Sequence, residues 1–178
     1  MTTRRTFLVV GLAGGAALTA AWWLRGRPGQ DAWPEAFAPL ASLDAEAPAI
    51  VAAIARALLD GALPATPQEQ ATAVATTVGS VARAVSGLPP AAQKELGELF
   101  ALLGLAPTRI ALARVTAPWA EASVASVGAF LDRWRASDWQ LQRAAYDAMH
   151  QLVFAAWYGN PGAWPAIGYP GPPTGVLA

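Results

Sequence analysis

His150 is the only histidine in the chain and the first residue to examine for acid–base or metal chemistry. A general base needs a nucleophile or a carboxylate within hydrogen-bond reach. On a helix, Asp147 and Tyr146, three and four residues earlier, would come near the imidazole. A lone histidine without a second ligand cannot form a zinc site. We therefore expect His150 to be a packed or interface residue rather than a catalytic one.

The carboxylates do not form a catalytic pair in the sequence. Glu95 and Glu98 would share one helix face beside Lys94, which is typical of a solvated surface. Asp44 and Glu46 lie at a predicted helix start, where the helix dipole favours negative charge. No catalytic residue is predicted on this chain.

The composition restricts the cofactors and partners that the chain could bind. It has no cysteine, which excludes disulfides, zinc–thiolate sites and iron–sulfur ligation. It also has no Gly-x-Gly-x-x-Gly nucleotide loop. No cofactor-binding residue and no metal ligand are therefore predicted here.

The charges are balanced overall but unevenly distributed along the chain. All twelve acidic residues lie after Gln30 with eight of the twelve basic ones, so this body carries 8 − 12 = −4. A mildly acidic body without a basic stripe argues against nucleic-acid binding. Arg133, Arg135 and Arg143 fall within eleven residues and would form either a solvated helix face or a docking surface for an acidic partner.

The N-terminus has the pattern of a twin-arginine export signal. Arg4 and Arg5 precede Phe7 and Leu8, and a weakly hydrophobic stretch follows. This pathway moves folded proteins, often because a cofactor or partner must be assembled first. The sequence therefore predicts a periplasmic protein that uses the twin-arginine translocase. An export tag for folded proteins, on a chain with no cofactor motif, suggests that the cofactor is on a partner exported with it.

Two fates of this segment, residues 1–24, remain open. Thr19–Ala21 offers small residues for cleavage before Trp22. Alternatively, residues 6–24 are long enough, at ~1.5 Å per residue, to cross a ~30 Å hydrocarbon core as an uncleaved anchor in the inner membrane. Trp22 and Trp23 would then lie in the aromatic belt.

Residues 25–45 are predicted to be an extended linker, which Trp33 and Phe37 are expected to hold against the domain. The sequence then predicts one helical domain over residues 46–159. Its fold class is all-α, a bundle of five or six short helices with an N-terminal signal or anchor helix. The expected helices are 46–61, 67–86 ended by a left-handed Gly87, 91–103, a short one from Pro107 to Val115, one capped by Ser123, and the longest, ending at Tyr158.

Capping boxes and apolar periodicity define the expected helix starts and buried faces. Thr66–Glu69 and Ser137–Gln140 both match the capping-box pattern. The predicted buried residues are Ile50, Ile54, Ala57 and Leu58; Leu96, Leu99, Phe100 and Leu103; Val127, Phe130, Leu131 and Trp134; and Leu141, Ala145, Ala148, Met149, Leu152 and Ala156. We also expect Trp119, Trp139 and Trp157 in the core.

The last segment, residues 160–178, is rich in proline, glycine and aromatic residues. Five prolines between Asn160 and Pro173 argue against helix and sheet. Because Trp164, Ile167 and Tyr169 would be unfavourable in water, we predict an ordered docking arm that lies on the body or on a partner. The candidate partner contacts are Trp157, Tyr158, Trp164, Ile167 and Tyr169.

These segments carry a family resemblance. With the twin-arginine leader and the alanine-rich body, Trp157–Pro161 and Trp164–Gly171 make the chain similar to the small subunit of membrane-associated flavin dehydrogenases, the gluconate 2-dehydrogenase subunit 3 type. The likeness covers most of the body, through the helix at 130–135. It is specific mainly in Tyr158-Gly159-Asn160 and Gly168-Tyr169-Pro170-Gly171. The leader departs from the twin-arginine consensus at Val9, where lysine is frequent.

The resemblance implies a division of labour. In that family the large subunit is a glucose–methanol–choline-type flavoprotein, which carries FAD and usually lacks its own signal. A cytochrome subunit often takes the electrons. The small subunit carries no catalytic residues and accompanies the large subunit outward. A different hypothesis is an envelope helical module that binds a lipid or another apolar ligand between its alanine-rich helices.

Overall fold

The computed structural model describes residues 35–171. The predictions for the leader, including Arg4, Arg5, Phe7 and Leu8, lie outside these residues. So do those for Trp33, for the first part of the linker and for the arm beyond Gly171.

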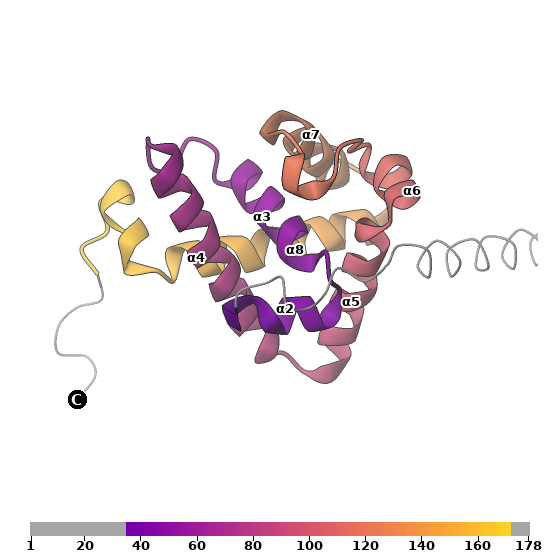
Figure 1. The fold of residues 1–178 in the computed structure, drawn as a ribbon, viewed down its shortest axis with the longest axis horizontal. Coiled ribbons are helices and arrows are strands. Elements are labelled where there is room, and N and C mark those ends of the chain that lie inside the picture. Colours follow the sequence, from indigo (N-terminus) through magenta and orange to yellow (C-terminus); the bar gives the residue numbers. More distant parts are fainter. Residues whose placement is uncertain (1–34, 172–178) are drawn as a thin grey trace, which may run out of the picture.

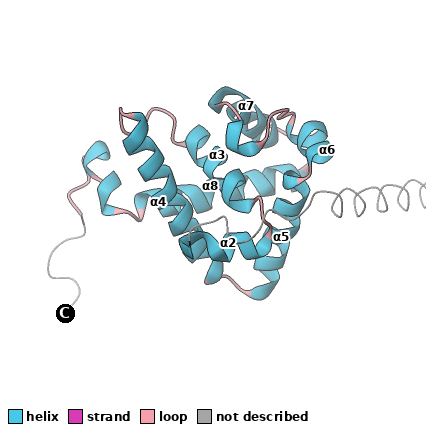
Figure 2. Ribbon diagram, viewed as in Figure 1, coloured by secondary structure: helices cyan, strands magenta, loops and turns pink. Residues whose placement is uncertain are grey.

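The described residues form an all-α bundle without strands, which confirms the predicted fold class (Figures 1 and 2). Seven α-helices occur in this range instead of the expected five or six, because one of them lies in the predicted linker. The helices are α2 (Ala38–Leu43), α3 (Ala47–Leu58), α4 (Pro67–Ser86), α5 (Pro90–Gly104), α6 (Ala106–Thr108), α7 (Val124–Arg135) and α8 (Gln140–Tyr158). A π-helical turn, η3 (Arg109–Ala113), follows α6, and 3-10 turns span Glu35–Phe37, Trp119–Glu121, Pro161–Ala163 and Pro165–Ile167.

Helix α2 corrects the expectation of extended chain over the linker. Leu40 is fully buried, and α2 contacts both α4 and α5. Pro39 lies in the first turn, where its missing N–H would have no helical partner in any case. Phe37 packs against the core as expected. Pro39 is therefore compatible with a short helix start, and burial of the apolar Leu40 favours the helix.

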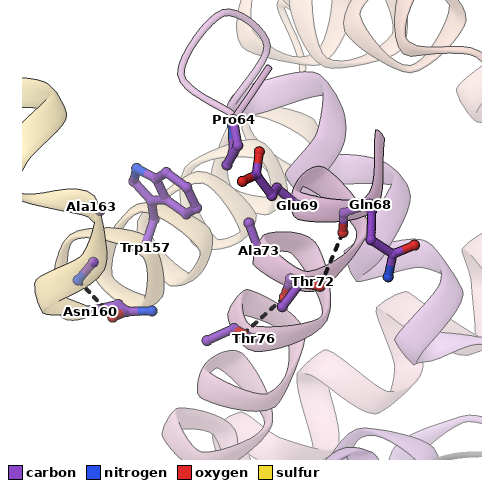
Figure 3. Close-up of a pocket in the computed structure, with 10 residues that line it drawn as sticks. Pro64, Gln68, Glu69, Thr72, Ala73, Thr76, Trp157, Asn160 and Ala163 are labelled. Carbon is purple, nitrogen blue, oxygen red and sulfur yellow. Dashed lines mark hydrogen bonds between the residues drawn. The ribbon is translucent and has the colours of Figure 1, made fainter. Parts of the chain in front are cut away.

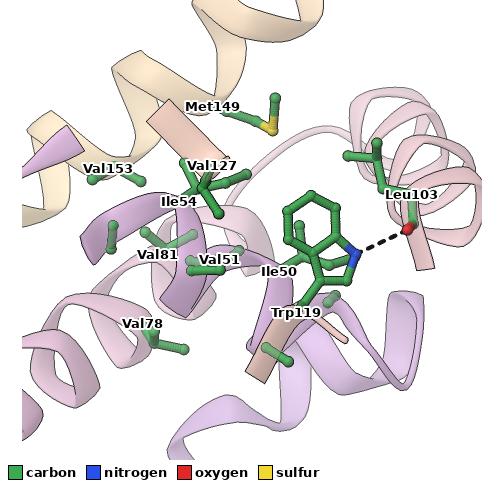
Figure 4. Packing of buried hydrophobic residues seen from close by; sticks show 14 of the residues in the cluster. Ile50, Val51, Ile54, Val78, Val81, Leu103, Trp119, Val127, Met149 and Val153 are labelled. Carbon is green, nitrogen blue, oxygen red and sulfur yellow. Dashed lines mark hydrogen bonds between the residues drawn. The ribbon is translucent and has the colours of Figure 1, made fainter. Parts of the chain in front are cut away.

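Helix α3 is the centre of the bundle. It contacts α4, α5, α7 and α8, and its buried residues occupy more than one face (Figures 1 and 4). Ile50 and Ile54 are buried as predicted, whereas Ala57 and Leu58 are only partly buried. Alanines supply much of the rest, and their small side chains let neighbouring helices approach closely. The buried set is Ala47, Pro48, Ala49, Ile50, Val51, Ala53, Ile54 and Ala55.

Two predicted helix starts are confirmed by their hydrogen bonds. The Glu69 amide donates to Thr66 Oγ1 at 3.3 Å, and the Thr66 hydroxyl donates to Glu69 Oε2 at 2.7 Å. Ser123 Oγ accepts from the Ser126 amide at 3.2 Å. Both side chains satisfy amides that a helix start leaves without a partner.

Two predicted boundaries are wrong in detail. Gly87 ends α4 with φ −86°, so the helix does not stop in a left-handed conformation. The segment at Ser137 is not a capping box with Gln140. Instead, the Ser137 hydroxyl donates to Gln142 Oε1 at 2.6 Å, and Ser137 Oγ accepts from the Trp139 amide at 3.1 Å. This turn precedes α8, whose first residue is Gln140.

The buried face of α8 also differs from the prediction. Leu141 is 79% exposed, and the buried row is Met149, Val153 and Trp157. Ala145, Leu152 and Ala156 are only partly buried. Apolar residues on several sides of α8 allowed more than one stripe, and the row with Val153 and Trp157 buries larger side chains than the alanine-rich one. At 19 residues α8 is also slightly shorter than α4, which has 20.

Within residues 35–171 no single helix has both the length and the hydropathy needed to cross a membrane. Two sharply bent pairs, Glu35–Leu43 with α3 and α5 with Ala106–Ala113, pass that test together by length and composition alone.

Candidate functional site

His150 belongs to a row of aromatic rings along one side of α8. Its ring centroid is 5.6 Å from that of Tyr146 and 4.3 Å from that of Phe154, with which it is stacked. The Phe154 and Tyr158 centroids are 5.7 Å apart. The four residues recur every fourth position, which places them on neighbouring turns of one helix face. We call Tyr146, His150, Phe154 and Tyr158 the aromatic row.

This arrangement gives His150 aromatic neighbours rather than a carboxylate. Among residues 35–171, no hydrogen bond or salt bridge joins His150 to Asp147. In the structure the imidazole lies between the Tyr146 and Phe154 rings.

The acidic residues are dispersed over the part of the chain that the structure describes. No group of three or more His, Asp or Glu side chains within residues 35–171 could hold a metal ion. Glu98 makes an exposed pair with Lys94 at 3.9 Å, and Asp44 Oδ1 accepts from the Glu46 amide at 2.9 Å. Both are local surface or capping contacts.

The C-terminal arm, residues 160–171 of the described chain, is folded onto itself. The indole N–H of Trp164 donates to the Tyr158 carbonyl at 2.7 Å, and the Tyr169 amide donates to the Trp164 carbonyl at 3.1 Å. The Trp164 and Tyr169 rings meet edge to face at 5.2 Å. Trp164 thereby joins the arm to the last turn of α8, and we call the aromatic row together with the arm the aromatic surface.

The expectation that the arm cannot be helical is wrong at the level of single turns. Pro161–Ala163 and Pro165–Ile167 are 3-10 turns, and each proline lies at a turn start, where it loses no hydrogen bond. Asn160 Oδ1 caps the first turn by accepting from the Gly162 amide at 3.0 Å. The arm leaves the bundle at the end of α8, on the opposite side from α6 (Figure 1).

The predicted partner-contact residues divide into two groups. Trp157 is buried in the core, and Trp164 is partly buried by the contacts described above. Tyr158, Ile167 and Tyr169 are exposed, Ile167 at 55% and Tyr169 at 45%. The structure thus keeps three large side chains of this region in contact with solvent.

A shallow groove of about 290 Å³ lies beside the arm (Figure 3). One wall is the start of α4, including Gln68 and Thr72, and the other is Trp157 with Asn160 and Ala163. The Thr72 hydroxyl is already bonded to the Gln68 carbonyl at 3.0 Å. The groove therefore presents mainly carbon atoms and few free polar groups.

The other tryptophans show which aromatic predictions fail. Trp119 and Trp134 are buried as expected, and the Trp119 indole N–H donates to the Leu103 carbonyl at 2.9 Å (Figure 4). Trp139, expected in the core, is 68% exposed. It precedes α8 at the outer end of a turn, so no helix packs over it.

The predicted arginine cluster makes mostly backbone contacts. An Arg133 guanidinium nitrogen donates to the Ala113 carbonyl at 2.6 Å, and Arg143 donates to the Ser137 carbonyl. Arg135 pairs with Asp132 at 3.3 Å, with both side chains exposed. Two of the three arginines therefore hold turns together.

Sequence reasoning missed the buried arginine of this region. Arg109 is 8% exposed, and its guanidinium donates to the carbonyls of Val115 at 3.2 Å and Thr116 at 3.3 Å. The position of Arg109 between two apolar segments of the sequence could have indicated that its side chain is buried. These bonds satisfy carbonyls that the irregular chain after η3 leaves without helical partners.

The aromatic row was also missed, although its spacing of four is visible in the sequence. The sequence also has no Asp, Glu, Lys or Arg after Asp147, a second sign of an uncharged surface at this end of the chain that was overlooked.

No model of a protein family, no curated protein and no solved structure matches this chain.

Proposed function

We propose that this chain is a non-catalytic accessory subunit of a periplasmic, FAD-dependent sugar, sugar-acid or alcohol dehydrogenase of the glucose–methanol–choline type. It would aid the export, folding or membrane association of that flavoprotein. The FAD would be on the large subunit, and a cytochrome subunit would accept the electrons.

The observation that carries this proposal is the position of the segments with the family resemblance. Tyr158-Gly159-Asn160 ends α8, and Gly168-Tyr169-Pro170-Gly171 ends the described arm. Both belong to the aromatic surface, and their tyrosines are exposed. The chain has no Asp, Glu, Lys or Arg after Asp147, and exposed tyrosine with few charged neighbours is typical of the centre of a protein–protein interface.

The arm is also suited to binding a protein partner with little ordering. Its 3-10 turns, the bond from Trp164 to the Tyr158 carbonyl and its prolines fix the chain before a partner arrives. Less conformational freedom then remains to be lost on binding. Tyr158, Ile167 and Tyr169 are the side chains that we expect the large subunit to cover.

The export step is tested with Arg4→Lys combined with Arg5→Lys in a strain that also expresses a leaderless flavoprotein encoded beside this chain. We expect the dehydrogenase activity of the periplasmic fraction to be lost, because the partner depends on this leader. A periplasmic activity that stays unchanged while this chain remains in the cytoplasm would refute co-export.

The interface is tested with Tyr158→Ala combined with Tyr169→Ser, with Trp139→Ser as the matched control at the other end of α8. The first variant should reduce co-purification of the flavoprotein with the tagged chain at least tenfold, and the control should leave it unchanged. Equal recovery of the flavoprotein with both variants would show that the aromatic surface is not the interface.

The groove beside the arm favours the second candidate, an envelope module for an apolar ligand. A lipid analogue that binds in this groove should be displaced by Ala73→Trp, which fills it. Binding that is saturable in the native chain and absent in this variant, without any flavoprotein partner, would favour this alternative.

A further inference from the structure

We propose that the end of the bundle formed by η3 and by the turn between α7 and α8 binds an anionic phospholipid surface. This inference does not rest on the accessory-subunit role, because it concerns the end of α8 opposite the arm. We call this end, Arg109–Arg114 with Asp132–Arg143, the basic end.

The basic end exposes large apolar side chains that no helix of the bundle covers. Trp139 and Leu141 protrude from the start of α8, and they are the most exposed large apolar residues within 35–171. Ile110 and Leu112 are exposed on η3. Two lie on η3, and the other two lie at the start of α8.

Two hydrogen bonds bring these segments together at one end of the bundle. The Trp134 indole N–H donates to the Leu112 carbonyl at 3.4 Å, and Arg133 donates to the Ala113 carbonyl at 2.6 Å. The last turn of α7 therefore lies against η3, and the chain reaches Trp139 only a few residues later. In Figure 1, α6, which leads into η3, lies at the far end of the molecule from the arm.

Positive charge accompanies the apolar side chains. The basic end carries the exposed Arg114, Arg135 and Arg143 and the partly exposed Arg133, against Asp132 and Asp138, which gives 4 − 2 = +2 without the buried Arg109. Residues 35–171 as a whole carry 8 − 11 = −3. This charge separation would orient the basic end toward an anionic surface and the remainder of the body away from it.

The interleaving of charge and apolar side chains favours a lipid surface over a protein partner. Arg114 follows Leu112 by two residues, and Arg143 follows Leu141 by two residues. Protein interfaces are depleted of charge at their centre, as in the uncharged arm. A lipid headgroup layer accepts the combination, since tryptophan and leucine enter the acyl boundary while arginine reaches phosphates.

Arg114 has an unusual backbone conformation. Arg114 has φ +53°, and it is the only non-glycine residue within 35–171 with a positive φ. A left-handed conformation is strained for a residue with a Cβ, and glycine would relieve the strain. Arg114 therefore keeps an exposed positive charge at the end of η3 although glycine would fit its backbone better.

The absence of cysteine from the chain makes a site-specific test feasible. Leu141→Cys carries an environment-sensitive fluorophore in the full chain, and Ile167→Cys on the arm is the matched control with an exposed apolar side chain. Each labelled protein is mixed with vesicles of phosphatidylcholine alone and of equimolar phosphatidylcholine and phosphatidylglycerol. Because each signal reports one position, the apolar segment at the N-terminus does not obscure the result.

We expect the fluorophore at position 141 to shift to the blue with the anionic vesicles and to be quenched by brominated acyl chains. The fluorophore at position 167 should give no such response. Adding Arg114→Gln, Arg135→Gln and Arg143→Gln should weaken the apparent affinity reported at position 141 at least tenfold, and high salt should do the same. Circular dichroism checks that the helical content is retained.

Three outcomes would overturn the proposal. The fluorophore at position 141 stays unchanged with anionic vesicles, or it responds equally to both vesicle compositions, or the arginine substitutions leave its response intact. A response at position 141 to a purified acidic protein and not to vesicles would assign the basic end to a protein partner instead.

Discussion

The imidazole of His150 stacks on the ring of Phe154, with centroids 4.3 Å apart and planes inclined by 26°. The chain's one histidine is therefore part of an aromatic packing surface. Its neighbours on α8 above and below are also aromatic, and each ring limits the rotamers of the next.

From this packing we predict that His150→Ala will leave the turnover of an associated dehydrogenase nearly unchanged while lowering the stability of the chain. The lost ring contacts should destabilise it by about 0.5–1.5 kcal/mol. His150→Phe, the control, keeps an aromatic ring and should retain the stability. Urea denaturation and steady-state kinetics measure the two effects. A turnover more than tenfold lower, in a complex that still assembles, would contradict this prediction.

Trp119→Phe should destabilise the bundle, because Trp119 combines full burial with a hydrogen bond to the Leu103 carbonyl. The substitution leaves that carbonyl without its donor at the end of α5, which costs about 1–3 kcal/mol. Trp139→Phe is the matched control and should have almost no effect, since Trp139 is exposed. Thermal denaturation of the two variants compares them. If the two variants have the same melting temperature, the hydrogen bond to Leu103 is not significant for stability.

Gly171→Ala should release the arm more than Gly168→Ala does. Both glycines have a positive φ, so each alanine introduces backbone strain. Only at Gly171 would the added Cβ also approach Trp164, at 3.2 Å from its Cζ3 atom, whereas nothing lies within 4 Å at Gly168. Amide exchange at Tyr169, whose N–H is bonded to the Trp164 carbonyl, reports the release. Equal exchange rates in the two variants would show that the approach of the added Cβ to Trp164 does not displace the arm.

Deleting residues 160–178 should weaken the stability of the chain or of its complex, while deleting only residues 174–178 should do little. The larger deletion removes Ala163, which is buried in the core, and the bond from Trp164 to α8. In the full chain, the amides of Ala163, Ile167 and Gly168 donate within the arm and should exchange more slowly than free peptide. Exchange at the free-peptide rate, alone and with the large subunit, would show that the arm is not ordered.

The helix pattern was predictable because local signals and apolar periodicity agreed. Thr66 and Ser123 each cap a helix through an oxygen that the sequence places correctly. The α7 residues Val127, Phe130 and Leu131 are buried at the expected spacing. In each case one short segment contained the information that its structure needed.

Features that depend on distant parts of the chain were not predictable in the same way. Trp139 matched the core spacing, but no element packs over the start of α8. The choice of Val153 over Ala148 as a buried residue depends on which side of α8 faces α3 and α4. Arg109 is buried because irregular carbonyls six and seven residues later need donors. Only the assembled bundle supplies these reasons.

The central position of α3 has a consequence for how the body folds. Helices from both halves of the described chain cover it, from α2 before it to α8 near the end of the domain. No contiguous fragment that lacks α8 can complete this enclosure, so an unfinished chain would present Ile54 and the surrounding alanines to other molecules. Helix α8 thus completes the cover of α3, and folding of the bundle should be all-or-none rather than stepwise.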